Sequence, residues 1–110
     1  MAEPAKLLRH AKIIREDDPE EAMAAAAKAG SIFKKAGDKG GMLTAFRSIA
    51  SAVIEKDLER AAQLLFEKQE AFQSAGDRES EAAVLISITE LHLAIAHGAP
   101  STLEPVEQAL

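Results

Sequence analysis

The chain contains no cysteine, tryptophan or tyrosine, and only four phenylalanines and four prolines among its 110 residues. Without cysteine it forms no disulfide bonds, and no thiolate is present for catalysis or metal binding. No uninterrupted apolar run approaches the roughly 18 residues that suggest a membrane-spanning helix. The N-terminal sequence also lacks the basic and then apolar pattern of a secretory signal peptide. These absences predict a cytoplasmic protein that does not associate with membranes.

Concentrated positive charge is missing as well. The net charge is −5, and residues 1–76 carry 12 basic and 12 acidic side chains, whereas residues 77–110 carry one basic and six acidic side chains. Nucleic acids and anionic membrane surfaces bind to concentrated basic patches. The charge distribution therefore predicts that neither is a partner.

The chain does contain an internal repeat. A shift of 39 positions aligns residues 18–56 with residues 57–95 and gives nine identities. The identical pairs are Asp18 and Asp57, Glu20 and Glu59, Ala22 and Ala61, Phe33 and Phe72, Ala36 and Ala75, Gly37 and Gly76, Asp38 and Asp77, Ser48 and Ser87, and Ile49 and Ile88. A fixed period of about 20–50 residues is typical of helical-repeat proteins, in which neighbouring units bury each other's apolar faces.

The repeated residues also mark helix boundaries. The four aspartates at positions 18, 38, 57 and 77 stand where N-caps are preferred, and Gly37 and Gly76 stand where a helix ends in a left-handed residue. Helical spacing of the apolar residues predicts five helices, at about 3–16, 19–36, 39–56, 58–75 and 78–97, and the beginning of a sixth near Pro105. Short connections require neighbouring helices to be antiparallel. With helices alone predicted, the predicted fold is a single all-α domain.

Several packing roles follow from the composition. With so few aromatics, all four phenylalanines are expected to be core anchors, with Phe33 and Phe72 at equivalent positions. Gly30 costs about 1 kcal/mol relative to alanine in a helix interior, a cost that close helix contact would offset. Gly40 and Gly41 are expected to fray the first turn of their helix.

Two short motifs lie at the helix junctions, Gly76-Asp77-Arg78-Glu79-Ser80-Glu81-Ala82 and Asp57-Leu58-Glu59-Arg60-Ala61. They resemble the junctions of tetratricopeptide-type repeats, particularly the long-period variety. Residues matching the packing positions of that family are Leu7, His10, Ala11 and Ile14, then Phe46, Ile49, Ala50 and Val53, then Leu85, Ile88, Thr89 and His92. The alignment also makes His10 a packing histidine. The resemblance implies an α-solenoid of antiparallel helix pairs over residues 3–36, 39–75 and 78–110; a generic antiparallel helical bundle is the alternative.

The resemblance also implies a function. In this family a concave groove, lined by the first helix of each pair, holds a peptide or a partner helix. The matching groove positions are Leu8, Lys12, Arg15, Arg47, Ser51, Ile54, Ile86, Glu90 and Leu93. The expected groove is basic at one end and apolar to acidic at the other, so an acidic or amphipathic segment is the expected ligand. The chain would then be a non-catalytic protein–protein interaction module within a larger protein or assembly.

No catalytic, cofactor or metal site is predicted. His92 and His97 lie about 140° apart around a helix and so do not share a metal ion. The acidic residues at 16–21 lack the alternating oxygen ligands and central glycine of a calcium loop. The serines are not accompanied by a positioned histidine and acid, and no glycine-rich loop follows a predicted strand.

The second hypothesis is a structural or oligomerising domain. The helix that would cover residues 78–97 begins near Pro105 and has only six residues, whereas even a marginal isolated helix needs about 12–15. An uncovered apolar helix predicts self-association, most simply as a homodimer. The predicted contact residues are Leu85, Ile86, Ile88, His92 and Leu93. Truncation of a longer polypeptide, whose further repeats would provide the cover, is the alternative explanation.

Overall fold

A computed structural model describes residues 3–98 of the chain. It contains five helices: α1 (Pro4–Ile14), α2 (Pro19–Lys35), α3 (Lys39–Lys56), α4 (Leu58–Ala75) and α5 (Arg78–Gly98). Within the described residues there is no strand. The all-α class and the five predicted helices are confirmed, and each predicted boundary lies within two residues of the observed one. The predicted beginning of a sixth helix falls outside the described residues.

Aspartates begin four of these helices. Each accepts a hydrogen bond from the backbone N–H three residues further on: Asp18 from Glu21 at 3.0 Å, Asp38 from Gly41 at 2.9 Å, Asp57 from Arg60 at 3.1 Å and Asp77 from Ser80 at 3.2 Å. Gly37 and Gly76 have φ angles of 71° and 69°, the left-handed conformation that glycine adopts without a steric penalty. The turns from α2 to α3 and from α4 to α5 therefore have the same construction.

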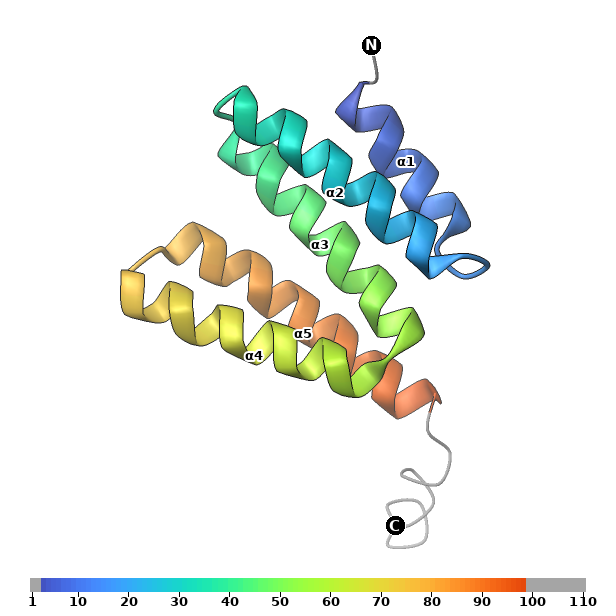
Figure 1. Cartoon of the computed structure of the whole chain (residues 1–110). Coiled ribbons are helices and arrows are strands. Elements are labelled where there is room, and N and C mark those ends of the chain that lie inside the picture. The colour runs from blue at the N-terminus through green and yellow to red at the C-terminus, as the bar shows by residue number, and fades with distance from the viewer. Residues whose placement is uncertain (1–2, 99–110) are drawn as a thin grey trace, which may run out of the picture.

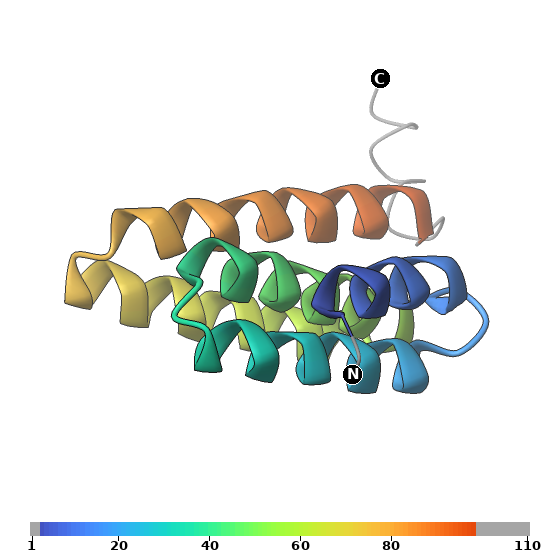
Figure 2. The same ribbon diagram turned by 90° about the horizontal axis from the view of Figure 1, so that it is seen from above.

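The helix α3 is the centre of the fold. It contacts each of the other four helices, whereas α2 and α4 do not contact one another. Figure 2 shows α5 along one side of the molecule and α2 along the opposite side, with α3 between them. The α2–α3 hairpin and the α4–α5 hairpin converge at the α3–α4 connection and diverge toward the turns at Gly37 and Gly76 (Figure 1). No described helix has both the length and the apolar character required to cross a membrane.

The core consists of two clusters of different composition. Alanine alone forms the buried part of the first: Ala11, Ala22, Ala26 and Ala52. Larger residues dominate the second, which joins α3, α4 and α5: Ala50, Val53, Ile54, Ala61, Leu65, Val84, Ile88 and Leu91. Small side chains allow helix backbones to approach closely, and the Cβ position at Gly30 would lie only 3.4 Å from the Cβ of Ala45. This close contact between α2 and α3 fits the role expected of Gly30.

The phenylalanines differ from the expectation. Phe66 is wrongly predicted as a core anchor, because it is 48% exposed on α4, and the other three are only partly buried. The ring of Phe33 lies against the backbone of Gly41, so closely that a Cβ at Gly41 would overlap it. Gly41 thus makes room for an aromatic ring, and its N–H is held by Asp38 within the first turn of α3.

His10 is also not a packing residue. Its side chain is 49% exposed, and its Nε2 lies 3.5 Å from Oε1 of Glu21 at the start of α2. The repeat alignment makes His10 equivalent to the apolar residues Ile49 of α3 and Ile88 of α5. However, α1 is the outermost helix of the described array and has a neighbour on one side only, so this position is not enclosed.

Candidate functional site

A pocket lies between α1 and α3. It has a volume of about 330 Å³, and its lining residues are Leu8, Arg9, Lys12, Arg15, Thr44, Arg47, Ser48 and Ser51. The first four come from α1 or the residue that follows it, and the last four from one face of α3. We call this pocket the basic groove, because four of the eight residues are lysine or arginine and none is acidic.

The structure brings together five of the nine predicted groove residues. Leu8, Lys12, Arg15, Arg47 and Ser51 all line the basic groove. Sequence reasoning missed Arg9, Thr44 and Ser48. The two α3 residues were available from the pattern, because positions 44, 47, 48 and 51 have the spacing of a single helix face.

The guanidinium of Arg15 is the most enclosed charge in the basic groove. Its Nε is buried and donates no hydrogen bond to any described residue, and Oε1 of Glu55 lies 3.9 Å away, beyond hydrogen-bonding range. A buried donor without a partner loses the free energy of a hydrogen bond to water.

A hydrogen bond connects the groove to α5. The hydroxyl of Ser51 donates to the carboxylate of Glu90, whose two oxygens lie 2.5 and 2.9 Å from Ser51 Oγ. Both residues were predicted for the groove, Ser51 on α3 and Glu90 on α5. Glu90 does not itself line the basic groove, but its carboxylate lies beside the groove residue Ser51, and its role in the groove stays a prediction.

Three predicted groove residues lie elsewhere. Ile54 is 7% exposed and packs in the core between α3, α4 and α5, so its assignment to the groove is wrong. Ile86 and Leu93 lie on α5 with 51% and 55% of their surfaces exposed, but they do not line the basic groove. The 39-residue alignment gave Ile54 and Leu93 the same role, although α5 covers the first of them and no described helix covers the second.

The predicted self-association residues also separate into two groups. Leu85, Ile86 and Leu93 are exposed by 43%, 51% and 55%, and His92 is exposed as well. Ile88 is 7% exposed and belongs to the core, so its assignment to an intermolecular contact is wrong. One face of α5 therefore holds Ile88 inside the molecule, and the opposite face presents large apolar side chains to solvent.

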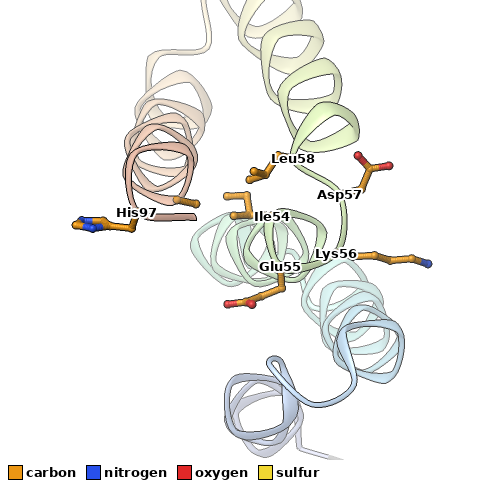
Figure 3. A pocket seen from close by; sticks show the side chains of 7 residues that line it. Ile54, Glu55, Lys56, Asp57, Leu58 and His97 are labelled. Atoms are coloured by element: carbon orange, nitrogen blue, oxygen red, sulfur yellow. The ribbon is translucent and has the colours of Figure 1, made fainter. Parts of the chain in front are cut away.

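A second hollow lies where α3, α4 and the end of α5 meet. It has a volume of about 650 Å³ and is lined by Ile54, Glu55, Lys56, Asp57, Leu58, Ala94 and His97. Ile54 and Leu58 point into the space between the helices, whereas the charged side chains and the imidazole of His97 point outward from it, with Lys56 and Asp57 on one side and His97 on the other (Figure 3). A catalytic site requires polar groups that converge on a common point, and the polar groups of this hollow do not. Within residues 3–98 no group of three metal-ligating side chains could hold a metal ion.

The chain was compared with known protein families, with curated proteins and with solved structures, and none of the three comparisons found a match. The resemblance to tetratricopeptide-type repeats thus depends on the residues of the chain alone and stays a prediction.

Proposed function

We propose that the chain is a non-catalytic protein–protein interaction module that binds an acidic segment of a partner in the basic groove. The observation that carries the proposal is the lining of this pocket, which includes Arg9, Lys12, Arg15 and Arg47 and no acidic residue. Such a cluster attracts negative charge over a distance and selects against basic partners. Its three arginines offer planar pairs of donors that match carboxylate geometry.

The surroundings of the groove support a ligand of mixed character. Glu90 ends the basic region on the side of α5, where it would repel an acidic residue, and apolar side chains follow on the exposed face of that helix. A segment with acidic residues followed by apolar ones fits this order. The family resemblance, the repeat of 39 residues and the all-α fold agree with a binding scaffold of stacked helix pairs.

A peptide array that samples acidic, basic and amphipathic segments tests the proposal. We expect acidic segments to bind, and the triple variant Lys12→Glu, Arg15→Glu and Arg47→Glu to lose at least tenfold in affinity. A matched control is Lys28→Glu, Lys34→Glu and Lys35→Glu, which makes the same change in net charge on exposed positions of α2. Equal binding by the groove variant and the control would show that the basic groove is not the binding site.

The exposed face of α5 favours a second function, association of the chain with its own copy. Between Ala82 and His97 the only acidic or basic residue besides histidine is Glu90, whose carboxylate is bound to Ser51. Two copies of this face can meet without placing like charges together. Closed two-fold pairing is the commonest arrangement of oligomers, and large exposed apolar patches are unusual on monomers.

Light scattering after size exclusion tests this second function. We expect a dimer of the 11.7 kDa chain, and we expect Ile86→Glu or Leu93→Glu to give a monomer. Phe66→Glu is the matched control, because Phe66 is similarly exposed but lies on α4, and it should leave the dimer intact. A monomer at high concentration, or a dimer that resists both α5 variants, would contradict self-association through α5.

A further inference from the structure

An apolar cleft opens between the two helical hairpins. Figure 1 shows the α2–α3 and α4–α5 hairpins diverging toward their turns. At the wide end a pocket of about 500 Å³ is lined by Gly37, Lys39, Met42, Leu43, Phe46, Lys68, Phe72, Asp77 and Ser80. We call it the interhairpin cleft. It shares no lining residue with the basic groove, so it is a separate site.

The walls of the interhairpin cleft are aliphatic and aromatic. Met42, Leu43 and Phe46 come from the first half of α3, and Phe72 faces them from the last turns of α4. None of these four side chains is fully buried, and Met42 is 37% exposed. Large apolar side chains, which are few in this chain, therefore line a space of the size that small ligands occupy.

Two lysines, Lys39 and Lys68, are among the lining residues of the cleft, and they differ in their ion pairs. The ammonium of Lys39 lies 2.9 Å from Oδ1 of Asp77 and 3.9 Å from Oε2 of Glu79. The hydrogen bond from the Ser80 hydroxyl is the largest cause that lowers the pKa of Asp77, to about 2, and the hydrogen bond from Lys39 is the next. The charged carboxylate of Asp77 therefore forms an ion pair with Lys39. Lys68, on the α4 side, makes no ion pair with any residue in the described range 3–98.

We propose that the interhairpin cleft binds a small amphipathic carboxylate, a linear fatty acid of medium chain length. The hydrocarbon chain lies between Phe46 and Phe72, and the carboxylate pairs with Lys68. Apolar walls with a few polar groups at one end are the usual construction of a small-molecule site, in which the polar groups fix the orientation of the ligand. Lys39 already pairs with the carboxylates of Asp77 and Glu79, which leaves Lys68 as the cation that pairs with a negatively charged head.

Titration of the whole chain with straight-chain carboxylates tests the proposal. The probes are octanoate, decanoate and dodecanoate below their aggregation concentrations, followed by calorimetry and by ligand-observed NMR. Each added methylene that enters an apolar site should tighten the dissociation constant by up to about fourfold. Decanol and decyltrimethylammonium, which carry a neutral and a positive head, should bind at least threefold and tenfold more weakly than decanoate.

Variants test the contribution of the ligand's carboxylate separately from that of its hydrocarbon tail. Lys68→Gln should weaken decanoate binding at least threefold and leave decanol binding unchanged. Met42→Glu places a carboxylate in the wall at an exposed position and should weaken decanoate binding at least tenfold. Arg47→Glu in the basic groove is the control and should leave decanoate binding unchanged.

Three results would overturn the proposal. The first is the absence of carboxylate binding in a chain whose circular dichroism spectrum shows folded helices. The second is an affinity that does not increase with chain length. The third is decanoate binding that Arg47→Glu weakens as much as Lys68→Gln, since this would place the anion in the basic groove.

Discussion

The two aligned units, residues 18–56 and residues 57–95, begin and end their helices in the same way but pack differently. Three buried positions that hold alanine in the first unit hold a larger residue in the second. These pairs are Ala26 and Leu65, Ala45 and Val84, and Ala52 and Leu91, and all six residues are buried. The first unit is stabilised by close backbone approach and the second by larger apolar side chains, so one set of helix signals supports two kinds of core.

The junctions of the two units show the same contrast. Phe33 and Phe72 are equivalent, as are Gly41 and Ser80. In the first unit the ring of Phe33 rests on Gly41. In the second unit the hydroxyl of Ser80 bonds to Asp77 instead, and Phe72 lines the interhairpin cleft. The equivalent positions Gly41 and Ser80 therefore have different roles: the first accommodates an aromatic ring, and the second provides a hydroxyl to the N-cap.

The largest expected effect concerns the core of the second unit. Leu65 is fully buried, so Leu65→Ala should lower the free energy of unfolding by about 2–5 kcal/mol, a large part of the roughly 5–15 kcal/mol that stabilises a typical domain. Urea denaturation followed by circular dichroism measures the change. Phe66→Ala, at the neighbouring half-exposed position, is the control and should cost less than half as much. Similar costs at both positions would refute the packing described for α4.

The second prediction tests the closed contact of the first unit. Gly41→Ala should lower the free energy of unfolding by about 1–3 kcal/mol, because the added methyl group overlaps the ring of Phe33. In a chain that already carries Phe33→Ala, the same change should cost little, since the ring is no longer there. The four chains form a double-mutant cycle, and a coupling energy near zero would contradict the contact.

Local signals in the sequence were enough to predict the helices. A cap such as Asp57 and a turn such as Gly37 depend on residues only a few positions away, and the structure confirms both. The exposure of Phe66 and His10 was predicted wrongly because it depends on which helices lie alongside, and the repeat pattern does not encode this.

The candidate site was predictable only in part, for the same reason. The resemblance to tetratricopeptide-type repeats supplied the groove positions, and five of the nine line the basic groove. Ile54 was assigned to that surface because it matches a groove position of the family, and such a match does not show which helices cover the residue. In the structure the larger residues of the second unit, Val84 and Leu91 among them, form a core that also encloses Ile54. The interhairpin cleft had no signal in the sequence, because it arises from the divergence of two hairpins.

The smallest expected effect concerns the aspartates that cap α3 and α5. Asp77 accepts hydrogen bonds from the hydroxyl of Ser80 at 2.6 Å and from Lys39 at 2.9 Å, whereas its counterpart Asp38 faces Gly41, which has no hydroxyl. The Ser80 hydroxyl and then Lys39 lower the pKa of Asp77 from 3.8 to about 2. Between about pH 2 and pH 3.8 the unfolded chain binds a proton at this carboxyl and the folded chain does not.

The contribution of Asp77 to the free energy of unfolding should therefore be fully present above pH 3.8 and be lost as the pH falls through about 2. A carbon-13 NMR titration of the Asp77 carboxyl group measures its pKa directly. Ser80→Ala removes the largest cause and should move the pKa back toward 3.8, whereas Lys39→Gln should move it by less. The same variants should reduce the difference between unfolding free energies measured at about pH 6 and at about pH 3. If Ser80→Ala leaves the pKa of Asp77 unchanged, the hydroxyl does not stabilise the charged cap, and the two junctions differ only in their packing.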